Sequence, residues 1–200
     1  MGKASEKARG IFLRHGGILR SYEARRQGIH PETLSRMVRH GLLEREERGL
    51  YRLAEIEPAG NADLIQVAKR VPQGVVCLIS ALSFHDLTTQ IPYKVYLALP
   101  QRVKKPKLAY PPLHLVWLSG EAHSAGIELH KLDGVSVPIY NREKTIADCF
   151  KFRTRLGLDV AIEALRDYLQ LPDRNIDELL RYAAVDRVEK IMRPYLEALL

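Results

Sequence analysis

The sequence predicts an α+β protein: an N-terminal winged helix-turn-helix, then a C-terminal α+β domain with a small, mainly antiparallel sheet and a helical tail. Three observations lead to this fold class. Residues 21–53 read as helix, turn, helix and hairpin, residues 93–140 contain apolar runs typical of strands, and residues 158–200 repeat apolar residues at helical spacing. Residues 55–61 read as a linker, so we expect a winged helix-turn-helix domain at 1–57 and an α+β domain at 61–200.

The first domain opens with a helix predicted at residues 6–15, with Ala8, Ile11 and Phe12 towards the core. Gly16 and Gly17 end this helix because glycine adopts a left-handed backbone conformation at little cost. Residues 18–19 then form a short strand beside the hairpin.

The helix-turn-helix follows from the residues at the helix ends. Ser21 is the predicted N-cap of a helix that runs to Gln27 and stops at Gly28. Pro31 suits the first turn of the next helix, and Gly41 ends that helix. About three residues therefore separate the two helices, which is the spacing of the DNA-binding motif.

The second helix of the motif divides into an apolar and a polar face when successive residues advance by about 100°. Leu34, Met37 and Val38 fall on the side that we expect to pack on the domain. The opposite side carries Glu32, Ser35, Arg36, Arg39 and His40, with Thr33 at its margin.

A hairpin wing follows, with strands from Leu42 and from Leu50 on either side of a charged turn at residues 44–49. A solvated amphipathic helix followed by an unrelated hairpin is the alternative interpretation. The turn, cap, helical-wheel and hairpin signals agree on the DNA-binding motif instead. We expect base or groove contacts from Ser35, Arg36 and Arg39, and phosphate or minor-groove contacts from Arg25, Arg26, Thr33, Arg45 and Arg48.

The charge distribution supports a nucleic-acid partner for the first domain. The net charge is +7, of which residues 1–53 carry +6 and residues 54–200 carry +1. A basic face confined to one segment is typical of phosphate binding. Double-stranded DNA is therefore the expected partner.

The second domain is predicted element by element from periodicity and turn signals. Ser80 is expected to cap a short helix that runs to about Leu87, after an apolar run at 75–79, and Asn141 is expected to cap a helix from 142 to about 155. Asp133-Gly134 is a type I′ hairpin signal. The remaining helices are expected at 63–70, 158–169, 175–185 and 186–200, with a kink or restart at Pro194, and the strands at 93–99, 114–118, 127–132 and 135–140.

Composition excludes several classes of protein. No apolar run approaches the roughly 18 residues of a membrane span, and the polar N-terminus is unlike a secretory signal. Cys77 and Cys149 lie in apolar surroundings and fit buried thiols better than a disulfide. We therefore expect a cytoplasmic protein.

The chain lacks the motifs of a metal or nucleotide site, so we expect no metal, no cofactor and no enzyme activity. His85 is interpreted as a hydrogen-bonded structural histidine at a helix end. Asp148 lies one helical turn beyond Lys144 and near Lys151, which favours ion pairing on a helix. A nucleic-acid hydrolase that uses Asp86 or Asp148 is the enzyme alternative.

Two further segments each have two interpretations from the sequence. A basic loop at residues 101–108 is a candidate secondary basic surface, either for phosphate, RNA or an acidic partner or as a solvated loop. Its cations are Arg102, Lys104, Lys105 and Lys107. The last helix, with Val188, Ile191, Tyr195, Leu196 and Leu199, is expected to pack in the core, with a dimer contact as the alternative.

The order of these segments resembles a known family. A winged helix is followed by VVCLISALSFHDLTTQIPYKVYLALP at 75–100, by VSVPIYNREKTIADCFKF at 135–152, and by a helical tail. This arrangement resembles the AbiEi-type antitoxins of bacterial type IV toxin–antitoxin, or abortive-infection, systems, also described as transcriptional regulators of viral (phage) defence systems. The family more usually has glycine at the position of Asp86.

The resemblance implies a repressor that binds repeats upstream of its own operon and an antitoxin that counteracts a nucleotidyltransferase-like toxin without a stable complex. The alternative is a winged-helix protein whose C-terminal domain is a protein-interaction platform. A monomer that reads two repeats side by side and a dimer are equally consistent with the sequence.

Overall fold

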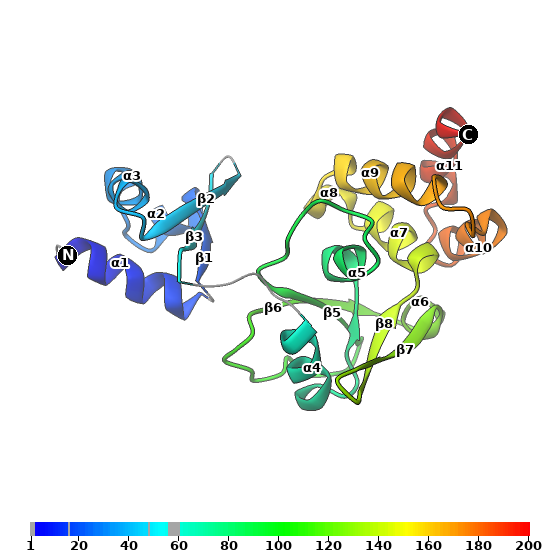
Figure 1. Ribbon diagram of the computed structural model, residues 1–200, viewed down its shortest axis with the longest axis horizontal. Coiled ribbons are helices and arrows are strands. Elements are labelled where there is room, and N and C mark those ends of the chain that lie inside the picture. Colours follow the sequence, from blue (N-terminus) through cyan, green and yellow to red (C-terminus); the bar gives the residue numbers. More distant parts are fainter. Residues whose placement is uncertain (1–2, 16, 48, 56–60) are drawn as a thin grey trace. The chain divides into compact units, whose positions relative to one another are not determined.

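The computed structural model contains helices and two sheets, so the predicted mixed α+β class is confirmed (Figure 1). It describes residues 3–15, 17–47, 49–55 and 61–200, with the backbone alone at 18, 46, 47 and 50. The chain divides into two compact units, which comprise residues 1–58 and 59–200.

In its described residues the first unit combines three helices with a three-stranded antiparallel sheet of order β1-β3-β2. Its apolar core contains Phe12, Leu34 and Met37, so the predicted inner face of the second motif helix is confirmed. Its elements are α1 (Lys3–Arg14), β1 (Ile18–Arg20), α2 (Ser21–Arg26), α3 (Pro31–Arg39), β2 (Leu43–Glu47) and β3 (Leu50–Leu53).

Glycines end α2 and α3, as predicted. Gly28 and Gly41 have φ values of +81° and +66°. The second amide after each C-cap residue, Gln27 or His40, donates to a carbonyl one turn back in the helix: Ile29 N donates to Ala24 O and Leu42 N to Met37 O, both at 2.9 Å. This is the Schellman arrangement, in which a left-handed residue satisfies the last carbonyls of a helix.

The start of α2 differs from the prediction. Ser21 is the first helical residue, and Arg20 is the N-cap. The Glu23 carboxylate accepts the Arg20 amide at 2.8 Å, while the Ser21 amide donates to Gly49 O at 2.7 Å. The N-cap is therefore Arg20 instead of Ser21, because the Glu23 carboxylate accepts the Arg20 amide, which has no partner within the helix. The Ser21 amide has its partner in the hairpin turn.

The hairpin is longer than predicted. Glu44 and Arg45 lie in β2 rather than in a turn, and β2 and β3 leave only residues 48–49 between them. Glu44 pairs with Arg52 across the strands, where their side chains also form an ion pair. This cross-strand pair favours strand over turn at two charged positions.

The second unit is a five-stranded sheet covered by helices on both faces (Figure 1). Its strands are β4 (Val75–Val76), β5 (Val95–Pro100), β6 (Leu113–Leu118), β7 (Ile127–Leu132) and β8 (Val135–Tyr140). Its helices are α4 (Asn61–Arg70), α5 (Leu78–Phe84), α6 (Glu121–Ser124), α7 (Arg142–Lys151), α8 (Arg153–Leu156), α9 (Leu158–Leu169), α10 (Ile176–Val185) and α11 (Glu189–Leu199).

The prediction of a mainly antiparallel sheet was wrong. The strand order is β6-β5-β4-β8-β7; β4–β5 and β7–β8 are antiparallel, whereas β4–β8 and β5–β6 are parallel. The segment between β5 and β6 must therefore run back along the sheet instead of turning as a hairpin. The β7–β8 hairpin is confirmed, with positive φ at both Asp133 and Gly134.

Ser80 does not cap a helix, contrary to the prediction. α5 begins at Leu78, two residues earlier, and the Ser80 side chain lies inside it. Its Oγ accepts the Tyr96 amide at 3.0 Å and donates to Lys94 O at 3.3 Å. The serine thus joins α5 to β5, because a hydroxyl can satisfy strand groups as readily as a helix end.

Asn141 caps α7 as predicted, with its Oδ1 accepting the Lys144 amide at 2.9 Å. The predicted helix to residue 155 is divided into α7 and α8 at Phe152. In the closing helix Leu196 is buried and Ile191 and Tyr195 pack against the core, so its core role is confirmed.

Two apolar clusters fill the second unit, one on each face of the sheet. Leu64 and Val67 of α4 pack with Val137 and Ile139 on one face. On the other face Tyr140 meets residues of α5, α7 and α9. Across the described ranges, no helix is long and apolar enough to cross a membrane.

Candidate nucleic-acid interface

The outer face of α3 carries the residues predicted to read DNA. Ser35 and Arg39 are exposed, and Arg36 is half-buried. Leu34 and Met37 are buried on the opposite side. Thr33 is half-buried at the margin, so the predicted division of the helix is observed. Glu32 is exposed at the start of the same face.

The turn before α3 positions this face. His30 is the N-cap, and its Nδ1 accepts the Glu32 amide at 3.3 Å, while Pro31 occupies the first turn. The sequence analysis missed His30 because histidine is not among the preferred N-cap residues, which are Ser, Thr, Asp and Asn. Arg25, Gly28, Ile29, His30 and Pro31 line an open hollow at this turn.

Cations flank α3 on both neighbouring elements. Arg25 and Arg26 are exposed in the last turn of α2, and Arg45 is exposed on β2 opposite Tyr51. Arg48, also predicted to contact DNA, lies outside the described residues. Arg52 is different: it is buried, pairs with Glu44, and donates from Nη1 to Leu53 O at 3.1 Å, so it stabilises the hairpin.

The candidate secondary basic surface lies in the second unit. Arg102, Lys104, Lys105 and Lys107 are all exposed on the segment between β5 and β6. We call these four residues the basic strip. Tyr110 lies on the same segment and Trp117 lies on β6, and both side chains are exposed. The sequence analysis did not connect these two aromatic residues with the basic strip.

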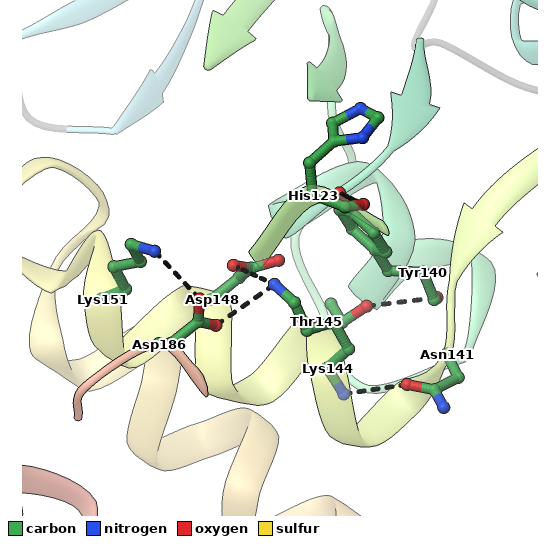
Figure 2. Close-up of polar contacts among 8 residues, drawn as sticks. All are labelled: His123, Tyr140, Asn141, Lys144, Thr145, Asp148, Lys151 and Asp186. Carbon is green, nitrogen blue, oxygen red and sulfur yellow. Dashed lines mark hydrogen bonds and ion pairs between the residues drawn. The ribbon is translucent and has the colours of Figure 1, made fainter. Parts of the chain in front are cut away.

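The charged side chains of α7 take part in a buried ion-pair cluster (Figure 2). Lys144 Nζ lies 2.6 Å from Asp148 Oδ1 and 3.2 Å from Asp186 Oδ2, and Lys151 Nζ lies 2.9 Å from Asp186 Oδ1. The Lys144 side chain is fully buried. Asp186 was missed because it joins the cluster from 42 residues away, beyond any local sequence signal.

Burial and the neighbouring opposite charges have opposite effects on the pKa of Lys144 and on that of Asp148. Burial, with the charge of Asp186 added, raises the pKa of Asp148 to about 7 against the lowering effect of Lys144. Burial lowers the pKa of Lys144, but its two aspartate partners outweigh burial and leave that pKa raised. Oδ2 of Asp148 has no partner among the described residues. This arrangement holds charge inside the fold.

Other residues weighed for catalysis also have structural partners. His85 Nε2 lies 2.7 Å from Tyr140 O at the end of α5, and burial lowers the pKa of the imidazole, so its structural role is confirmed. Burial raises the pKa values of the thiols of Cys77 and Cys149, and both cysteines are free. Asp86 is exposed at the end of α5. Within the described ranges, no three His, Cys, Asp or Glu side chains are grouped to hold a metal.

The chain is similar to known proteins in two comparisons. The crystal structure of the RV2827C protein from Mycobacterium tuberculosis is similar at a TM-score of 0.43 and 12% identity, over 98% of this chain and 82% of that chain. No curated protein matches the chain. Residues 8–54, from α1 to just past β3, match the family described as "Transcriptional regulator, AbiEi antitoxin", which confirms over this segment the resemblance that the sequence predicts.

Proposed function

We propose that this protein is a DNA-binding transcriptional repressor of its own operon and an antitoxin of a type IV toxin–antitoxin system. In this proposal the first unit is a winged helix-turn-helix, α3 enters the major groove, and the β2–β3 hairpin is the wing. The family match over residues 8–54 supports a regulator or antitoxin role. The protein acts by binding rather than by catalysis.

The observation that carries the DNA-binding proposal is the two-sided character of α3. Its inner side is fixed by Leu34 and Met37 in the core, so its outer side projects from a rigid base. Arginine can bond guanine O6 and N7 with two donors, and serine accepts or donates to either base or phosphate. Ser35, Arg36 and Arg39 supply these groups within two turns of helix.

The first test is a gel-shift titration on duplex DNA from upstream of the gene, in the presence of competitor DNA. Arg36→Ala and Arg39→Ala are each expected to weaken specific binding by about 1–3 kcal/mol, or roughly 5- to 150-fold in Kd, if the arginine bonds a base with two donors. Arg166→Ala, an exposed arginine on α9, is the matched control. Parental affinity of both α3 variants for the operator would refute the assignment of α3 as the recognition helix.

The antitoxin part of the proposal is tested by rescue. Expression of the protein is expected to restore growth to cells that express a nucleotidyltransferase-like toxin from the same operon, without a stable complex on co-purification. The Arg36→Ala/Arg39→Ala variant separates the two activities, because it is expected to lose repression and to retain rescue.

One observation favours the second candidate, a protein-interaction platform in residues 61–200. β7 is an edge strand of the sheet, and its Leu129 side chain is 69% exposed. An exposed strand edge with apolar side chains is a template for pairing with another chain. A stable complex in pull-down from the native host, lost in Leu129→Lys, would support this candidate over the type IV mode.

A further inference from the structure

The segment that joins β5 to β6 is the most one-sidedly charged part of the second unit. No acidic residue occurs between Asp86 and Glu121, a stretch that includes Lys94 and the whole basic strip. The four strip side chains are exposed within six consecutive positions. Such a stripe attracts a polyanion, and no carboxylate interrupts it along the chain. In space the buried Asp63 lies next to its far end, where Asp63 Oδ2 accepts the Tyr110 hydroxyl at 3.5 Å.

The segment that carries the basic strip is anchored to the rest of the second unit at Val103, Leu108 and Tyr110. Val103 N donates to Pro100 O and Trp117 Nε1 donates to Val103 O, each at 2.9 Å. Val103 and Leu108 pack against the apolar cluster beneath α4. Farther along, Gln66 Nε2 donates to Tyr110 O at 2.9 Å. These anchors limit the freedom that the segment has to lose when a ligand binds.

An exposed aromatic ring lies towards each end of this segment. Trp117 is 42% exposed beside Val103, and Tyr110 is 47% exposed beyond Lys107. Exposed rings beside cations are the usual combination for single-stranded nucleic acid, where bases stack on the rings and phosphates meet the cations. A duplex keeps its base faces stacked inside and cannot use such rings.

We propose that the basic strip with Trp117 and Tyr110 is a binding site for single-stranded nucleic acid, separate from the DNA-reading face of α3. The phosphates contact the strip, and unpaired bases stack on Trp117 and Tyr110. This site would give the second unit its own ligand. The proposed repressor function assigns a ligand, duplex DNA, only to the first unit.

The single tryptophan of the chain makes the test direct. Titration of the full-length protein with twelve-nucleotide oligo(dT) or oligo(U), neither of which forms a duplex with itself, is expected to quench Trp117 fluorescence saturably. The apparent affinity should fall with salt, with a slope of about 0.7 for each phosphate contacted. Absence of saturable quenching by either oligonucleotide would overturn the proposal.

Variants separate this site from general charge effects. Lys104→Ala/Lys105→Ala/Lys107→Ala is expected to lower affinity at least tenfold and to flatten the salt slope by about two. The matched control, Lys131→Ala/Arg166→Ala/Lys190→Ala, removes the same charge from exposed positions on β7, α9 and α11. Equal losses in the two triple variants would mean non-specific attraction and would overturn the proposal.

Trp117→Ala, followed by the anisotropy of a labelled oligonucleotide, is expected to weaken binding by roughly 5- to 150-fold, as loss of one stacked base would. Trp117→Phe should recover most of this affinity, because it keeps a ring and loses only the bond to Val103. Equal weakening in both would indicate a structural role for the indole N–H and would contradict stacking.

Two competitors decide the kind of polyanion. Polyglutamate or a blunt duplex that displaced the oligonucleotide as well as unlabelled oligo(dT) would overturn the proposal in favour of an acidic-protein or duplex surface. Arg36→Ala/Arg39→Ala should leave the quenching unchanged, so failure of the repressor proposal and failure of this one are distinguishable.

Discussion

At the scale of single residues, Lys144 is a buried cation of the second unit that is held by two carboxylates. It is fully buried, its ammonium bonds Asp148 and Asp186, and it lies 4.7 Å from the centre of the Tyr140 ring. A buried ion pair adds little stability over apolar packing, yet removal of one partner leaves a charge without compensation. The consequence is strong dependence on Lys144 rather than strong net stabilisation.

Lys144→Met is therefore expected to lower the free energy of unfolding by about 3–5 kcal/mol, because it leaves Asp148 without its ammonium. Urea denaturation followed by Trp117 fluorescence measures the loss. Lys144→Met/Asp148→Leu should be more stable than Lys144→Met alone, since Lys151 still neutralises Asp186. A single variant within 1 kcal/mol of the parent would contradict the buried charge balance.

Asp148 adds a pH dependence to the same cluster. Its pKa rises from an ordinary 3.8 to about 7 in the folded state, so the folded protein binds this proton more tightly than the unfolded chain does. Its contribution to stability is then complete below the unfolded value and is lost as the pH rises through about 7.

Asp148→Asn is expected to remove that contribution, so the decline in unfolding free energy between pH 4 and pH 7 should be shallower in the variant than in the parent. Urea midpoints across this range test the expectation. Glu197→Gln, at an exposed carboxylate on α11, is the control and should leave the profile unchanged. Parallel profiles for Asp148→Asn and the parent would exclude Asp148 as the titrating group.

At the scale of elements, the end of α5 explains why an aspartate can occupy position 86. Asp86 has φ +55°, and the amides of Asp86 and Leu87 donate to Ser83 O and Leu82 O in the same Schellman arrangement that follows α2 and α3. Glycine adopts this conformation most readily, and aspartate is among the few other residues that tolerate it. Asp86 thus meets a backbone requirement that glycine would also meet.

The hairpin of the first unit is expected to contact phosphate through Arg45 rather than to read bases. Arg45→Ala should weaken binding to operator and unrelated duplexes alike and reduce the salt slope by about one. Fluorescence anisotropy on both duplexes at several salt concentrations measures this, with Arg166→Ala as the control. Loss of affinity for the operator alone would instead indicate base contact from the hairpin.

Some elements could be predicted from local sequence and others could not. The β7–β8 hairpin, the Asn141 cap and the glycine stops of α2 and α3 depend on residues within a few positions of one another. The strand order of the five-stranded sheet could not be predicted from local sequence, because the two-residue strand β4 that joins its halves is too short to give a periodic signal. Asp186 could not be predicted as a member of the ion-pair cluster either, because tertiary packing brings it to Lys144 and Lys151.

At the scale of the whole molecule, the two compact units have separate apolar cores. Phe12, Leu34 and Met37 belong to a cluster in the first unit, and the two clusters of the second unit share no residue with it among those described. The tryptophan lies in the second unit, so its fluorescence reports the folding of that unit alone. Unfolding of the chain should accordingly be the sum of two transitions.

Phe12→Ala tests this independence. Phe12 is fully buried, and its truncation is expected to cost the first unit about 3–5 kcal/mol. Duplex binding should be lost at a lower urea concentration than in the parent, while the Trp117 transition stays in place; Lys144→Met should shift the Trp117 transition instead. If Phe12→Ala moved the Trp117 transition as far as Lys144→Met does, the two units would unfold as one cooperative block. Loss of duplex binding or of single-strand binding in a destabilised variant could then not be assigned to the unit that carries the mutation.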